Sequence, residues 1–232
     1  MWCGGNELQG GLDGGKTGIG KPVTLDHPLI RRWQALVERE DPGRRFVPTS
    51  SSGPRFMADE KDFGKGLHWD VHGPWKAPGA DAAASERYWR GDDALFRSET
   101  GAPGASSAEI IRRSSGGMPC LPANADNPLW RRCMWWIEWK DFLAQHAREP
   151  ASLEEYVQWS QARQAEAIAM AIRASKARFP GIGGIILWMG HDAWPCAANT
   201  AIIDVDGAPK PAALAAAKEW KTPASQVRAA EG

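Results

Sequence analysis

Two acidic residues stand at the ends of short apolar segments, each with a glycine close behind. Residues 94–99 read Ala-Leu-Phe-Arg-Ser-Glu and end on Glu99, and residues 1–7 end in the same way on Glu7, ahead of a glycine-rich stretch. A buried strand that delivers a side chain to its carboxyl end, where a loop begins, has this pattern. One such carboxylate is usually only a solvated strand end. Two together can supply the nucleophile and the acid/base of retaining glycoside hydrolysis.

The segments around both carboxylates resemble motifs of glycoside hydrolase family 2, in its β-mannosidase-like branch. Residues 2–7 (WCGGNE) resemble the acid/base motif, and residues 98–101 (SETG) resemble the nucleophile motif, although an aromatic residue is more usual than Thr after the Glu. Residues 184–195 (GIILWMGHDAWP) and 202–211 (IIDVDGAPKP) resemble the last barrel strand and the segment after it, with His191 where Asn is more usual. The three motifs occur in family order, and they specify the family better than the sugar.

The resemblance implies roles for individual residues. Glu99 is the expected nucleophile and Glu7 the expected acid/base. Asn6 is expected to bind the sugar 2-hydroxyl and Trp188 to lie beneath the sugar ring, although Asn6 could instead cap the loop and Trp188 could belong to the core. In related barrel glycosidases the peptide bond after this Trp is often cis, which points to Trp188–Met189. The further substrate-binding residues that we expect are Asp70, His72, Trp75, Asp192 and Trp194.

Arg97 lies two residues before Glu99, and therefore on the same face of the expected strand. A guanidinium there could hold Glu99 ionised through a hydrogen-bonded ion pair. We therefore add Arg97 to the expected substrate-site residues.

His68, Asp70 and His72 alternate along another expected strand, so the two imidazoles share one face. This spacing allows a metal site, but retaining glycosidases need no metal and no third motif completes one. We expect neither a metal nor a cofactor, and hydrogen-bonded core histidines are the alternative. The four cysteines also lack the C-x-x-C spacing of zinc sites. Cys120 and Cys133 could pair, or remain buried thiols.

Composition limits the classes of partner. The chain has 28 basic and 28 acidic residues and no apolar run of about 18 residues, so we expect no nucleic-acid or membrane partner. We also expect no signal peptide, because the chain begins directly with the motif strand. Thirteen tryptophans against two tyrosines fit a carbohydrate partner, since flat aromatic faces pack on pyranose rings. The compartment stays open.

Five strands are expected, near residues 1–7, 45–50, 67–72, 94–99 and 184–189. Helical patterns alternate with them, which predicts an α/β fold with a parallel sheet. The helices are expected near residues 27–40, 106–112, 127–139, 152–179 and 211–221.

By resemblance, the five strands are strands four to eight of a (β/α)8 TIM barrel, with strands one to three missing. Residues 1–221 would then be the C-terminal portion of a glycosidase catalytic domain, and residues 222–232 a frayed tail. Two hypotheses follow. The first is a retaining exo-glycosidase, most like β-mannosidase, with β-galactosidase or β-glucuronidase specificity as the alternative. It would require the missing strands and the β-sandwich domains that usually precede them. The second is an inactive, truncated remnant with at most residual carbohydrate binding.

Overall fold

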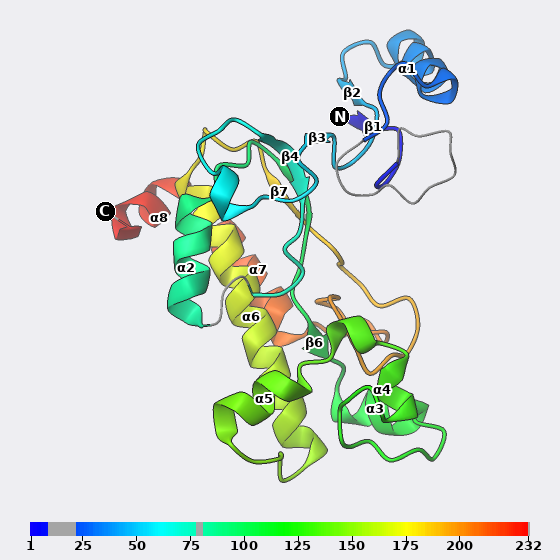
Figure 1. The fold of residues 1–232 in the computed structure, drawn as a ribbon, viewed down its shortest axis with the longest axis vertical. Helices are drawn as coiled ribbons and strands as arrows, with labels where there is room; N and C mark the ends of the chain where they lie inside the picture. Colours follow the sequence, from blue (N-terminus) through cyan, green and yellow to red (C-terminus); the bar gives the residue numbers. More distant parts are fainter. Residues whose placement is uncertain (9–21, 78–80, 232) are drawn as a thin grey trace. The chain divides into compact units, whose positions relative to one another are not determined.

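The structure is a computed structural model that describes residues 1–8, 22–77 and 81–231 (Figure 1). These residues divide into two compact units. The first unit comprises the described parts of Met1–Pro74 and Pro78–Thr100 together with Arg178–Leu187. The second comprises Trp75–Ala77, Gly101–Ala177 and the described part of Trp188–Gly232. Both units mix helices with short strands, so the fold is a mixed α/β fold.

The first unit carries the parallel strands. Strand β1 pairs in parallel with β2, and a second sheet has the order β3-β4-β5-β7, in which β4, β5 and β7 are parallel and β3 is antiparallel to β4. Among the described residues these strands form two separate sheets and no closed barrel. The elements of this unit are β1 (Trp2–Cys3), α1 (Pro28–Glu40), β2 (Phe46–Val47), β3 (Gly53–Pro54), the 3-10 helix η1 (Glu60–Asp62), β4 (His68–His72), α2 (Ala82–Gly91), β5 (Arg97–Thr100) and β7 (Ile185–Leu187).

The five expected strands are therefore present, but each is shorter than its apolar segment. Strand β3, the 3-10 helix η1 and helix α2 are additions to the prediction in this unit. Strand β3 falls where the Ser-Ser-Gly-Pro sequence suggests only a turn, because pairing with β4 extends the backbone there. Helix α2 begins after Asp81, whose carboxylate accepts a hydrogen bond from the backbone N–H of Ala84 at 2.7 Å. This contact is an ordinary N-cap.

The second unit is built around the longest helix, α6, against which α3, α7, α8 and β6 pack. Its first turn is capped as the Ser152-x-x-Glu155 pattern predicts, because the Glu155 backbone N–H donates to Ser152 Oγ at 3.2 Å. The elements of this unit are β6 (Gly104–Ala105), α3 (Ala108–Ser114), α4 (Pro128–Arg131), the 3-10 helix η2 (Met134–Trp136), α5 (Trp139–His146), α6 (Leu153–Ala177), β8 (Ala198–Asn199), α7 (Pro211–Lys221) and α8 (Ala224–Glu231).

The tryptophan-rich segment departs from its prediction. Instead of one helix over residues 127–139 it forms α4 and η2, and α5 begins at Trp139. In a single straight helix, tryptophans on different faces point in different directions and cannot all pack into one core. The breaks let Trp130 and Trp139 join the buried cluster around Phe142 and leave Trp135 57% exposed. Packing of the aromatic side chains therefore decides where this segment bends.

Residues 222–232, expected as a frayed tail, instead contain helix α8, which contacts α6 and buries Val227. The segment is held by the burial of Val227 and by the packing of α8 on α6, and its position at the end of the chain does not reveal this packing.

All four cysteines are free, so Cys120 and Cys133 do not pair. The expected helix over residues 211–221 and the expected cis bond between Trp188 and Met189 are confirmed. No described helix is long and apolar enough to cross a membrane.

Candidate active site

The carboxyl ends of four strands of the first unit meet at Ser50, three residues beyond β2. Parallel pairing continues past β1 and β2, since the Glu7 N–H donates to the Ser50 carbonyl and the Ser50 N–H donates to the Gly5 carbonyl. The Ser50 hydroxyl lies 2.6 Å from Nε2 of His72, at the end of β4, and 2.9 Å from the hydroxyl of Ser98 in β5. These contacts bring Glu7, His72 and the end of β5 together.

Glu7, His72 and Glu99 form the centre of the site. One carboxylate oxygen of Glu7, one of Glu99 and a ring nitrogen of His72 all lie within 4.8 Å of one another. Nδ1 of His72 is 2.8 Å from Oε1 of Glu7 and 3.7 Å from Oε2 of Glu99. Two carboxyl groups this close match the separation of about 5–5.5 Å that retaining glycosidases use, and are closer than the wider spacing of inverting ones.

The two carboxylates differ in exposure and in backbone conformation. The Glu7 side chain is 34% exposed, whereas that of Glu99 is 12% exposed. Glu7 also adopts a left-handed backbone conformation, with φ of 50°, which is uncommon for residues other than glycine and clusters at functional sites. The more open Glu7 is accordingly the one better placed to exchange protons with water.

The side chains of Glu7, His72 and Glu99 could together hold a metal ion. They form the one such group of His, Cys, Asp or Glu side chains among the residues that the structure describes. An imidazole and two carboxylates suit several divalent metals. The expected face of His68, Asp70 and His72 forms no such group, because the three side chains have separate partners. His68 lies 2.5 Å from Asp93 and is fully buried, so it is the hydrogen-bonded core histidine of the alternative interpretation.

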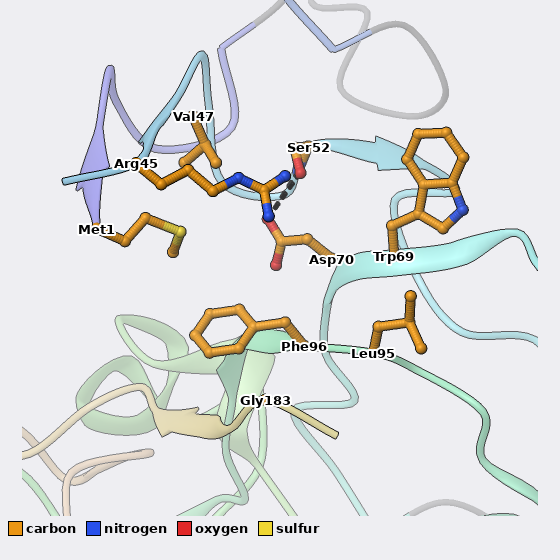
Figure 2. Close-up of a pocket in the computed structure, with 9 residues that line it drawn as sticks. All are labelled: Met1, Arg45, Val47, Ser52, Trp69, Asp70, Leu95, Phe96 and Gly183. Atoms are coloured by element: carbon orange, nitrogen blue, oxygen red, sulfur yellow. Dashed lines mark hydrogen bonds between the residues drawn. The ribbon is translucent and has the colours of Figure 1, made fainter. Parts of the chain in front are cut away.

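Asp70 is not part of the group that Glu7, His72 and Glu99 form. It lines a hollow of 620 Å³ whose other walls include Met1, Arg45 and Phe96, which precede β1, β2 and β5 (Figure 2). The hollow is therefore at the amino ends of the strands. The remaining lining residues are Val47, Ser52, Trp69, Leu95 and Gly183.

The hydrogen bonds of Asp70 explain this placement. Its Oδ2 accepts hydrogen bonds from the backbone N–H and the hydroxyl of Ser52, at 2.9 and 3.2 Å. Its Oδ1 is buried without a hydrogen-bond partner among the described residues. These contacts hold Asp70 beside Ser52, and its expected place beside the sugar stays a prediction.

Arg97 is buried and forms its ion pair with Asp92, through Nη2 at 2.6 Å. Its Nη1 donates to the carbonyl of Gly73, and its guanidinium lies 4.9 Å from the ring of Trp89. Arg97 therefore braces β5 from within the unit. The expected ion pair with Glu99 is wrong, because the fully buried guanidinium pairs instead with Asp92, a carboxylate that is itself buried.

Four expected site residues, Trp75, Trp188, Asp192 and Trp194, belong to the second unit. Trp188 packs on Trp136, with ring centroids 5.5 Å apart, and remains 37% exposed, so part of its face is open to a ligand. Trp194 is 66% exposed. Asn6 lies in the first unit, where its backbone bridges to Ser50.

Asp192 is 2% exposed and is held inside the second unit. Asn199 donates to its Oδ1, and the ammonium of Lys210 lies 3.9 Å from its Oδ2. Burial lowers the pKa of Lys210, which also donates to the Gly104 carbonyl at 3.3 Å. These contacts connect the segment after Trp188 to the start of α7 within the second unit.

Sequence reasoning missed Ser50 and assigned no role to Ser98. Ser50 stands at the end of the predicted strand over residues 45–50, so the strand-end argument that singled out Glu7 and Glu99 could have found it. Its contact with His72 depends on tertiary packing, and no local pattern carries that information.

No family model matches the sequence, and no curated protein sequence matches it. Among solved structures, β-D-mannosidase from Dictyoglomus thermophilum matches with a TM-score of 0.66 and 19% sequence identity. The match covers 94% of this chain and 26% of that chain, so the present chain spans about a quarter of the length of its structural neighbour. The chain has a β-mannosidase-like fold.

Proposed function

We propose that this chain is the part of a retaining β-glycosidase that carries both catalytic carboxylates, most like β-mannosidase. The observation that carries the proposal is the approach of Glu7, which follows β1, and Glu99, in β5, whose carboxylate oxygens lie within 4.8 Å of one another. The fold shared with a β-mannosidase supports a carbohydrate substrate. In this proposal β1, β2, β4, β5 and β7 correspond to barrel strands four to eight.

Hydrolysis would proceed in two displacements. Ionised Glu99 attacks the anomeric carbon while Glu7 gives its proton to the glycosidic oxygen, whose bond to that carbon breaks. Glu7, now a carboxylate, then removes a proton from water, and the resulting hydroxide displaces Glu99 from the glycosyl-enzyme. The greater exposure of Glu7 fits this second step, because the water must reach it.

The remaining roles are proposals of the same kind. Asn6, next to Glu7, would bind the 2-hydroxyl, a contact that strengthens towards the transition state. Trp188, partly exposed beside Trp136, would form the platform for the sugar ring. A β-galactosidase or β-glucuronidase specificity is the alternative choice of sugar.

A second candidate is an inactive remnant with residual carbohydrate binding. It is favoured by large apolar side chains that remain more than half exposed in the first unit. Such side chains call for a covering partner or mark an aggregation-prone surface. They are Met1, Trp2, Trp69, Leu95, Phe179 and Ile186.

Covalent labelling separates the two candidates. A 2-deoxy-2-fluoro β-mannoside with a dinitrophenolate leaving group should label the protein, and peptide mass spectrometry should find the sugar on Glu99. Glu99→Gln should abolish the label, and Glu60→Gln, a change at an exposed glutamate of the same unit, should not. Label on Glu7 would reverse the assigned roles. A folded protein without label or turnover would favour the remnant.

A further inference from the structure

His72 was expected to bind the substrate, but its contacts give it another role. The ring is fully buried, and both of its nitrogens already lie within hydrogen-bond distance of protein groups. Nε2 is 2.6 Å from the Ser50 hydroxyl, and Nδ1 is 2.8 Å from Oε1 of Glu7. The His72 backbone N–H donates to the Phe56 carbonyl at 2.8 Å, and the Phe56 ring lies against the imidazole, with centroids 5.6 Å apart. The imidazole is therefore fixed in place.

The partners on the two sides of the ring fit one neutral tautomer, with the ring proton on Nδ1. A serine hydroxyl can donate or accept, and Ser50 has a second hydroxyl partner in Ser98, 2.9 Å away. A carboxyl group can accept through one oxygen whether its other oxygen is protonated or ionised. Neutral imidazole has one donor nitrogen and one acceptor nitrogen. With the ring proton on Nδ1, every hydrogen bond in the row from Ser98 through Ser50 and His72 to Glu7 is therefore made in both states of Glu7.

We propose that His72 is a positioning residue for the acid/base Glu7, keeping its carboxyl group hydrogen-bonded in both protonation states that retaining hydrolysis requires. This inference rests on the proposed function. With Glu7 protonated on Oε2, Nδ1–H donates to Oε1, and Nε2 accepts from the Ser50 hydroxyl. With Glu7 ionised, the same two hydrogen bonds remain, and only Oε2 has lost its proton.

The proton count balances in both displacements. In the first, the proton on Oε2 of Glu7 moves to the leaving oxygen, and the ring stays neutral with its proton on Nδ1. In the second, Oε2 of Glu7 gains a proton from the attacking water, and the ring again keeps its proton on Nδ1. The charged groups that face the ring are Glu7 at 2.8 Å and the nucleophile Glu99 at 3.7 Å. Nδ1–H thus points at the two carboxylates that the reaction uses.

The experiment compares substrates that need an acid with substrates that do not. His72→Ala should slow kcat on methyl β-mannoside by about 10²-fold, the low end of what general acid–base catalysis contributes. On dinitrophenyl β-mannoside the first displacement should be slowed by less than about 10-fold, because that leaving group needs little protonation. KM should change little, and azide should accelerate turnover of the activated substrate, because it attacks the glycosyl-enzyme without a base.

Two further variants test the reasoning. His72→Asn places an amide near the position of Nδ1 and should recover part of the lost rate on methyl β-mannoside. His68→Ala removes another buried histidine of the same strand, bound to Asp93 rather than Glu7, and should leave the ratio of the two substrates unchanged.

Three outcomes would count against the role. A higher KM with equal losses on both substrates would make His72 a sugar ligand and overturn the inference. A substrate ratio that shifts equally in His68→Ala would reduce the effect to packing, and would also overturn it. If the unsubstituted protein folds but shows neither turnover nor label on Glu99, the proposed function fails and this inference fails with it.

Discussion

Glu138 makes the stability of the second unit depend on pH. This carboxyl group is 6% exposed, accepts a hydrogen bond from Ser160 Oγ at 3.0 Å and lies 3.3 Å from Nε of Arg163. Burial raises its pKa to about 7, against an ordinary value of 4.5, and the nearby Arg163 offsets only part of that effect. The folded state therefore holds a proton on Glu138 over a pH range in which the unfolded chain has released it.

The sign and size of the effect follow from this difference. Because the folded state binds more protons between pH 4.5 and 7, the free energy of unfolding should fall as pH rises through this window. At about 1.4 kcal/mol for each unit between the two pKa values, the full loss attributable to Glu138 is about 3 kcal/mol. It should be complete slightly above pH 7.

Urea unfolding at pH 5, 6, 7 and 8 measures the effect. Glu138→Gln, which cannot ionise, should be nearly flat where the unsubstituted chain declines, so the difference between the two curves isolates this residue. Asp141→Asn is the matched control, because Asp141 also lies near Arg163, at 3.9 Å, but its side chain is 56% exposed. The control should keep the decline. Parallel curves for Glu138→Gln and the unsubstituted chain would refute the reasoning.

Two further substitutions test the packing that positions the site. A Cβ at Gly101 would lie 2.1 Å from the Trp188 carbonyl oxygen, whereas one at Gly190 would meet nothing within 4 Å. Gly101→Ala should therefore destabilise the fold by about 1–3 kcal/mol and lower the midpoint of thermal unfolding, whereas Gly190→Ala should leave the midpoint nearly unchanged. Equal midpoints for the two variants would contradict the close approach at Gly101. Asp92→Ala should cost about 3–5 kcal/mol in urea unfolding, because it removes the 2.6 Å partner of the fully buried Arg97. A loss below about 1 kcal/mol would mean that water or another group compensates the guanidinium.

Much of the fold could be predicted from the sequence because its signals are local. Apolar segments that end on a carboxylate marked β1, which Glu7 follows, and β5, which contains Glu99, and a Ser-x-x-Glu pattern marked the start of α6. A loop begins where a strand ends, so a carboxylate at the last position of a strand lies beside that loop. The sequence motifs also pointed to the β-mannosidase-like fold that the structural comparison supports.

Tertiary structure decided which of these residues act together. Asp70 and His72 are two residues apart on one strand and look equivalent in the sequence, yet Asp70 meets Ser52 beside the amino-end hollow and His72 meets Glu7. Arg97 had a plausible partner in Glu99 and found Asp92 instead. Strand periodicity fixes the face on which a side chain lies, but its partner comes from another strand or loop whose register the local sequence does not encode. Whether a side chain meets its partner near the amino end or near the carboxyl end of the strands is decided only when the strands pack together.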